Sequence, residues 1–180
     1  VLAALLAFGS LPARADSPKA ADSAPLAERL AKGDRPEADK QRDAGRRPAE
    51  VLAFLGAEPG MTVMDLIAAG GYYTDVLSEA VGPEGKVYAQ NPPFVLRFRE
   101  GANDKQLSER LAGGRHPNVQ RLDQDLADVD VPAGSLDLAI TALNFHDIYN
   151  REGGEDAAHG FLTRVRELLK PGGILGIVDH

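Results

Sequence analysis

Apolar positions along the chain change their period repeatedly after residue 46. Short continuous apolar runs, which are typical of buried strands, alternate with stretches whose apolar side chains recur every three or four residues, as on one face of a helix. Glycine and proline clusters separate most of these segments. The pattern predicts strands at 61–66, 86–89, 118–122, 135–141 and 174–178, and helices at 48–55, 73–81, 107–111 and 161–169.

Strands that alternate with helices favour an α/β fold, here a Rossmann-like parallel sheet with helices on both faces. In such sheets ligands bind beyond the carboxyl ends of the strands, so we expect functional residues in the segments that directly follow them. The last apolar run reaches the end of the sequence. We therefore expect the fifth strand to be an uncovered apolar edge.

The first residues differ from the rest. Residues 1–11 are almost wholly apolar and are followed by Ala13-Arg14-Ala15, a small-x-small pattern that favours a secretory signal cut after Ala15. The alternative is a buried or amphipathic N-terminal helix. The run is too short to span a membrane, so we expect no stable membrane anchor. The secretory signal favours export, and we expect a bacterial periplasmic location. We expect 1–15 to be a signal remnant, 16–45 a leader with one helical turn, and 46–180 the domain.

Composition narrows the function further. The chain has 180 residues and no cysteine, which excludes disulfides, a cysteine-ligated zinc and a cysteine nucleophile. Its formal net charge of −7 would repel a phosphate backbone, so a nucleic-acid partner is not expected. An ordinary globular composition and this charge leave a small-molecule substrate or ligand as the expected partner. They indicate nothing about the oligomeric state.

Residues 65–74 are the richest segment for chemistry. Asp65 ends a strand, Ala69-Gly70-Gly71 form a small-residue turn, and a helix follows. The turn would let a ligand approach the backbone and the free N–H groups of the helix start. Asp65 would repel a phosphate and attract a cation, which disfavours a nucleotide-dependent oxidoreductase, as does the missing Gly-x-Gly-x-x-Gly pattern. The alternative is that the small residues only pack the helix on the strand.

Residues 46–180 resemble a class I S-adenosylmethionine-dependent methyltransferase (EC 2.1.1.-), and most closely a group of predicted exported methyltransferases. Segment 65–74 carries the resemblance. Further segments carry it as well: Arg46-Arg47-Pro48, 85–89, 143–147, 169–173 and Asp179-His180. The resemblance implies a seven-stranded domain, of which strands 6 and 7 would be missing from this chain.

The resemblance also implies a cofactor site. Asp65, Ala69, Gly70 and Gly71 would flank the methionine moiety of S-adenosylmethionine, and Asn144 would border it. Gln90, or Asn91 beside it, would bind the ribose, although the family has an acid there. Asp125 and Leu126 would bind the adenine, unless Asp125 is only a solvated loop residue. The family's first two turn glycines are replaced here by Ile67 and Ala69.

The resemblance places substrate and catalytic groups in the segment that contains His146 and Asp147. A neutral His146 imidazole could accept a proton from the methyl acceptor. The alternative is that His146 only holds its loop by hydrogen bonds. Asp147, Asp179 and His180 would end adjacent strands and could instead hold Mg²⁺ or a transition metal.

Two further histidines and one short motif have simpler interpretations. His116 and His159 lie in turn-like or charged stretches and are expected in solvent. Residues 91–94 spell the Asn-Pro-Pro-Phe signature of amino-group methyltransferases, but they follow the second strand rather than the fourth. We interpret them as a turn before a helix.

The sequence therefore predicts a methyltransferase that transfers a methyl group from S-adenosylmethionine to an unidentified acceptor. The alternative is a non-catalytic small-molecule-binding protein on a degenerate methyltransferase fold. Ile67, Ala69 and Gln90 favour this alternative. The expected export favours it as well, because S-adenosylmethionine is a cytoplasmic metabolite.

Overall fold

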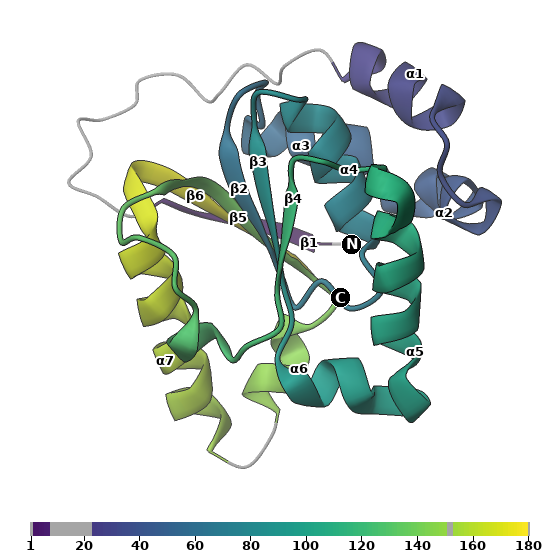
Figure 1. Ribbon diagram of the computed structural model, residues 1–180. Coiled ribbons are helices and arrows are strands. Elements are labelled where there is room, and N and C mark those ends of the chain that lie inside the picture. Colours follow the sequence, from purple (N-terminus) through teal and green to yellow (C-terminus); the bar gives the residue numbers. More distant parts are fainter. Residues whose placement is uncertain (1, 8–22, 151–152, 180) are drawn as a thin grey trace.

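The computed structural model describes residues 2–7, 23–150 and 153–179, which form one mixed sheet with flanking helices (Figure 1). The strands are β1 Leu2–Ala7, β2 Thr62–Leu66, β3 Lys86–Gln90, β4 Val119–Leu122, β5 Leu136–Ala142 and β6 Leu169–Asp179. The helices are α1 Ala24–Lys32, α2 Glu37–Arg46, α3 Pro48–Leu55, α4 Tyr72–Val81, α5 Pro93–Leu111, α6 Phe145–Tyr149 and α7 Gly154–Leu168, with 3₁₀ turns η1 Ala112–Gly114 and η2 Leu126–Asp128.

The sheet has the strand order β1-β6-β5-β2-β3-β4, in which β2 to β6 run parallel and β1 runs antiparallel. The chain builds β2, β3 and β4 outward in one direction and then crosses to β5 on the other side of β2. The strand order therefore reverses between β2 and β5, where ligands of parallel α/β sheets bind. This confirms the expected parallel sheet.

Alternate side chains of each strand feed two separate cores. Val63 of β2 packs in the core that α3 and α4 cover, whereas the next residue, Met64, packs in the core that α7 covers. Figure 1 shows α3 and α4 on one face of the sheet and α7 on the other. The expected helices on both faces are confirmed, and the pleat places Asp65, two residues after Val63, on the α4 face.

The five predicted strands correspond to β2 to β6, and the predicted helices overlap α3, α4, α5 and α7, whereas β1, α2 and α6 were not predicted. Strand β6 is longer than predicted, because it begins at Leu169 and includes the segment Lys170-Pro171-Gly172-Gly173. The pairing of β5 with β6 shifts register between Leu136 and Leu138, which accommodates the extra residues as an irregular stretch of strand.

The outer edge of β6 is covered rather than bare, so that expectation was wrong. Leu2–Ala7 pairs antiparallel with it, from Leu2 opposite Asp179 to Ala7 opposite Ile174. An unpaired strand edge offers N–H and C=O groups that such a segment can bind. The expected cleavage site after Ala15 lies outside the described residues, and the signal peptide stays a prediction. No helix in the described part of the chain has the length and apolar character needed to cross a bilayer.

Residues 24–46 form two helices, so the prediction of a leader with a single helical turn was wrong. Leu30 of α1 is buried against the α4 side of the core. In α2, however, the buried residue is a carboxylate, Asp39. Apolar periodicity therefore missed this helix because charged groups rather than apolar ones attach it to the fold.

Arg110 of α5 binds this carboxylate and thereby joins α5 to three other parts of the fold, namely α2, α4 and the turn after β2. Its Nη2 lies 2.7 Å from Asp39 Oδ2 and its Nη1 contacts Asp75 of α4, while Nε donates to the Gly70 carbonyl at 2.8 Å. The second oxygen of Asp75 lies 2.8 Å from His116 Nε2. His116 is thus buried, contrary to expectation, whereas His159 is exposed.

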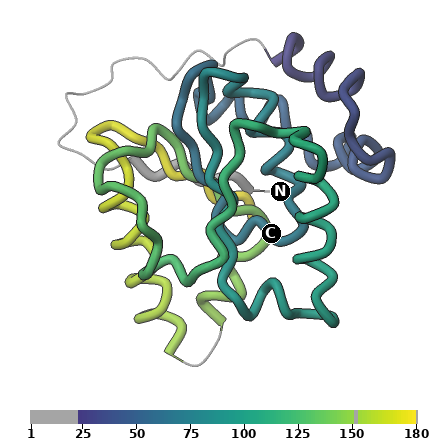
Figure 2. The backbone as a smooth tube through the Cα atoms, viewed as in Figure 1, coloured from purple at the N-terminus to yellow at the C-terminus, as the bar shows by residue number. Residues whose placement is uncertain are grey.

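Helix α5 is continuous only in outline. Its backbone leaves the helical region at Phe98, and Arg99, Glu100 and Gly101 have left-handed φ values. The helix begins at Pro93, so the turn expected at residues 91–94 is confined to Asn91 and Pro92 and the helix follows earlier than expected. The kink, visible as a sharp bend of the tube in Figure 2, divides α5 into a first half near the strand ends and a second half that carries Leu107 and Arg110.

Replacing Arg110 by Gln is expected to lower the free energy of unfolding by about 3–5 kcal/mol, because the buried carboxylates of Asp39 and Asp75 would both lose the guanidinium that they share. Urea denaturation measures this change. The matched control is Arg47→Gln, whose exposed ion pair with Glu50 contributes at most about 1 kcal/mol. Equal effects of the two substitutions would show that the Arg110 pairs do not hold the helices together.

Candidate functional site

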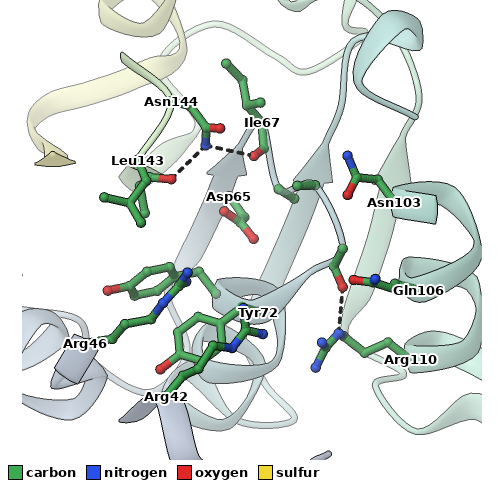
Figure 3. Close-up of a pocket in the computed structure, with 15 residues that line it drawn as sticks. Arg42, Arg46, Asp65, Ile67, Tyr72, Asn103, Gln106, Arg110, Leu143 and Asn144 are labelled. Atoms are coloured by element: carbon green, nitrogen blue, oxygen red, sulfur yellow. Dashed lines mark hydrogen bonds between the residues drawn. The ribbon is translucent and has the colours of Figure 1, made fainter. Parts of the chain in front are cut away.

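Two pockets lie side by side at the carboxyl ends of the parallel strands, and Ile67 lines both. The first, here the Asp65 pocket, has a volume of about 240 Å³ and is drawn in Figure 3. The second, the Asp125 pocket, has a volume of about 390 Å³. The Asp65 pocket is lined by Arg42, Arg46, Asp65, Ile67, Ala68, Ala69, Gly70, Tyr72, Tyr73, Asn103, Gln106, Arg110, Ala142, Leu143 and Asn144. The Asp125 pocket is lined by Ile67, Gln90, Pro92, Phe94, Asp125, Leu126, Ala127, Ile148, Ala157, Gly160, Phe161 and Arg164.

Asp65 lies at the end of β2, where its side chain is buried against α4. Its Oδ2 accepts a hydrogen bond from Thr74 Oγ1 at 2.7 Å. Burial raises the pKa of Asp65 to about 7, and the Thr74 hydrogen bonds only partly oppose this. The carboxyl group therefore changes its charge near neutral pH, and a cation in the pocket would favour the ionised form.

The turn after Asp65 has the left-handed conformation that glycines adopt most easily. Ile67 has φ 56°, Ala69 has φ 49° and Gly71 has φ 84°. A left-handed non-glycine residue costs about 1–2 kcal/mol, and a β-branched one such as Ile67 is a clear outlier. A Cβ on Gly71 would also lie 2.7 Å from Leu107 Cδ1, so α5 could not pack so closely. The turn thus has a glycine-like backbone at residues 67 and 69, which are not glycine.

Side-chain amides from the neighbouring strand hold this strained turn. Gln90 Oε1 accepts from the Ile67 N–H at 3.2 Å, and its Nε2 donates to the Gln124 carbonyl at 2.7 Å. Asn91 binds Ala69 twice, accepting from its N–H at 2.8 Å and donating to its carbonyl at 3.2 Å. Both residues are fully buried. Their expected contact with a ribose stays a prediction, and it would require these hydrogen bonds to be exchanged.

A third amide joins the turn to β5. Asn144 Nδ2 donates to the Ile67 carbonyl at 3.2 Å and to the Ala142 carbonyl at 2.8 Å (Figure 3). Leu143, just before it, has φ 60° and is exposed at the pocket. Asn144 thus fixes the end of β5 against the turn after β2. This is where the strand order of the sheet reverses.

Basic and aromatic residues that the sequence did not indicate form another wall of the Asp65 pocket. Arg42 and Arg46 reach it from α2, and Arg110 reaches it from α5 (Figure 3). The Tyr72 ring lies under Arg42 and Arg46, with their guanidinium carbons 4.9 Å and 4.4 Å from the ring centroid. The signal available in the sequence was a pair of tyrosines directly after the glycine turn.

The Asp125 pocket is mostly apolar. Leu126 is buried and Asp125 is exposed, directly before the turn η2. Arg164 of α7 holds that turn by donating to the Leu126 carbonyl at 3.3 Å and to the Val129 carbonyl at 3.1 Å. An apolar slot with a carboxylate at its rim suits a planar heterocycle that carries an amino group.

His146 and Asp147, the expected catalytic pair, lie in α6 and line neither of these two pockets. His146 Nδ1 lies 2.7 Å from Asp179 Oδ1, and the backbone N–H of His146 donates to Oδ2 at 2.9 Å. The ends of β5 and β6 are therefore adjacent, as expected. No group of three or more potential metal ligands was found among the described residues, and His180 of the metal alternative lies outside them.

The structure separates the expected site residues into three groups. Asp65, Ala69, Gly70 and Asn144 line the Asp65 pocket. Gln90, Asp125 and Leu126 line the Asp125 pocket. Gly71, His146 and Asp147 line neither of the two.

No protein-family model matches the sequence, and no curated protein matches it. The fold, however, is similar to many solved structures. A S-adenosylmethionine-dependent methyltransferase from Aquifex aeolicus is 26% identical with a TM-score of 0.62, over 88% of this chain and 73% of that one. A S-adenosylmethionine-dependent O-methyltransferase from Thermotoga maritima is 21% identical with a TM-score of 0.53, over 84% and 49%.

A phosphoethanolamine N-methyltransferase from Haemonchus contortus, solved with phosphoethanolamine and S-adenosylhomocysteine, is 18% identical with a TM-score of 0.58. The match covers 86% of this chain and 31% of that one. In this chain the five parallel strands have the order β4-β3-β2-β5-β6, with helices on both faces of the sheet. The chain therefore has the Rossmann-like fold of class I S-adenosylmethionine-dependent methyltransferases.

Proposed function

We propose that the protein binds S-adenosylmethionine and transfers its methyl group to a small-molecule acceptor. The observation that carries this proposal is the pairing of two unlike pockets across Ile67 at the point where the strand order reverses. The Asp65 pocket is polar and charged, and the Asp125 pocket is apolar. A ligand with a charged amino acid at one end and a planar base at the other fits this pair.

The polar and apolar groups of the two pockets suit the different parts of this cofactor. Asp65 would attract the cationic amino group and sulfonium, and the small-residue turn Ala69-Gly70-Gly71 would lie beside the methionine part. Leu126 would contact the adenine ring, and Asp125 would accept from its amino group. When bound, the cofactor supplies an electrophilic methyl group.

The chain's own residues would position the acceptor and accept its proton. Methyl transfer depends first on holding the nucleophile in line with the sulfonium. His146 lies between two carboxylates, with Nδ1 2.7 Å from Asp179 Oδ1 and Nε2 3.4 Å from Asp147 Oδ1. If Nδ1 donates to Asp179, the lone pair of a neutral imidazole is on Nε2 and could accept the proton of the acceptor. His146 would then have to meet the acceptor outside the Asp65 and Asp125 pockets.

A non-catalytic binding protein on the same fold is the second candidate. The specific observation in its favour is that the amide groups of Gln90 are both bound to the backbone of the protein. The ribose would then lack the acidic partner that the resemblance implies at this position. Periplasmic location, which would separate the protein from cytoplasmic S-adenosylmethionine, stays a prediction.

Titration calorimetry with S-adenosylmethionine is expected to give a Kd of about 1–100 μM for the full chain. Asp125→Asn is expected to weaken binding about tenfold, because the adenine amino group loses a charged acceptor. Asp123→Asn, on the same loop but outside both pockets, is the control. Absence of binding by the unmodified chain would refute the methyltransferase proposal, and binding without turnover over a panel of acceptors would favour the second candidate.

Ala69→Gly is expected to raise the free energy of unfolding by about 0.5–1 kcal/mol, because glycine adopts φ 49° without the steric cost that alanine has. Urea denaturation measures the change. Ala68→Gly is the control: Ala68 is buried and is not left-handed, so it should lower stability by about 1 kcal/mol. A destabilised Ala69→Gly variant would show that the turn is not strained.

Binding of S-adenosylmethionine is expected to strengthen as the pH rises from about 6 to about 7.5, because a cation favours the ionised Asp65, whose pKa is about 7 in the free protein. Below that pKa the ligand must displace a proton, so the Kd should rise toward tenfold for each lower pH unit. Asp65→Asn should bind more weakly at the upper pH and lose most of this dependence. A variant that keeps the full dependence would place its origin elsewhere.

A further inference from the structure

Arg46 differs from the other arginines of the Asp65 pocket. Arg42 contacts Asp39, and Arg110 contacts both Asp39 and Asp75. By contrast, no carboxylate of the described side chains forms an ion pair with Arg46. A guanidinium group at a pocket wall without an anionic partner is suited to an anion that a ligand supplies.

The Arg46 side chain has a defined position. Its guanidinium carbon lies 4.4 Å from the centroid of the Tyr72 ring, and Figure 3 shows it reaching from the end of α2 into the pocket. The Tyr72 ring is fixed in turn, because its hydroxyl donates to Asp43 at 2.6 Å. Asp43 is itself bound by Arg35 through two hydrogen bonds. Stacking on a ring leaves the N–H edge of a guanidinium available to a planar carboxylate.

Opposite charges act on the same residue inside this pocket. Burial raises the pKa of the Tyr73 phenol to about 12; the positive charge of Arg46 opposes this rise, and the negative charge of Asp65 adds to it. Tyr73 thus lies within electrostatic reach of both groups, and all three line the pocket. A cavity of about 240 Å³ therefore contains a cation at one wall and a buried acid at another.

A pocket with both charges matches a zwitterion better than a simple cation or anion. An α-amino acid group carries an ammonium, which Asp65 would favour, and a planar carboxylate, which suits the fork of a guanidinium. Arg42 and Arg110 are less suited to this task because their charges are already balanced by Asp39 and Asp75.

We propose that Arg46 binds the α-carboxylate of an amino-acid moiety held in the Asp65 pocket. The inference rests on the proposed function, in which that moiety is the methionine part of S-adenosylmethionine. It assigns a binding role to the last residue of α2, a helix that otherwise precedes the expected domain boundary at residue 46. Arg46 is here a ligand-binding residue, and the acceptor need not contact it.

The test is a four-way comparison by titration calorimetry with the full chain. The ligands are S-adenosylmethionine and decarboxylated S-adenosylmethionine, which keeps the sulfonium and the amino group but lacks the carboxylate. The proteins are the unmodified chain and Arg46→Gln. Loss of a charge-assisted contact should weaken binding of S-adenosylmethionine to Arg46→Gln about 10- to 100-fold. Binding of the decarboxylated ligand should change less than about twofold, because it never made that contact.

Arg47→Gln is the matched control, because Arg47 is the adjacent arginine, pairs with Glu50 and does not line the Asp65 pocket. It should bind both ligands as the unmodified chain does. Equal weakening of both ligands by Arg46→Gln, or no weakening of either, would overturn the inference while leaving the proposed function intact. Failure of the unmodified chain to bind either ligand would overturn both.

Discussion

The guanidinium group of Arg110 is the contact on which the candidate site depends. It joins Asp39 of α2, Asp75 of α4 and the carbonyl of Gly70 in the turn after β2. Both carboxylates are buried; without Arg110, among the described side chains, Asp39 would keep only its contact with Arg42, and Asp75 only its contact with His116. One side chain therefore fixes the position of the pocket wall relative to the turn, which apolar packing of α2 alone could not do.

The turn itself depends on polar contacts of a different kind. Two residues that are not glycine have left-handed backbones there, and amides from β3 and β5 bind the peptide groups on either side of them. Gln90 and Asn91 hold Ile67 and Ala69 from one strand, and Asn144 holds Ile67 from another. The side-chain amides that the resemblance would assign to a ligand thus hold the backbone of the turn in its left-handed conformation. The strained residues Ile67 and Ala69 are thus the ones that the amides bind, and strained backbone of this kind is common at functional sites.

The sequence was sufficient for the five parallel strands, because they are short apolar runs separated by clear turn residues. Motifs also marked Asp65 and Asp125, which the structure places in two neighbouring pockets at the strand ends. The sequence was insufficient for α2, since the inward-facing groups of that helix are charged and have no apolar periodicity. His116 was assigned to solvent for the same reason: its partner, Asp75, is distant in sequence and its burial leaves no local pattern. The resemblance indicated that the residues after the strands form the site. Only the three-dimensional structure shows that the side-chain amide of Gln90 is already hydrogen-bonded to the protein backbone.

The kink in α5 has a mechanical consequence. Because Phe98 to Gly101 leave the helical region, the first half of the helix, which places Phe94 at the Asp125 pocket, does not continue into the second half, which carries Arg110 beside the Asp65 pocket. In a straight helix, a tilt of the first half would be transmitted directly to Arg110. The break would let the two ends of the proposed ligand be accommodated separately.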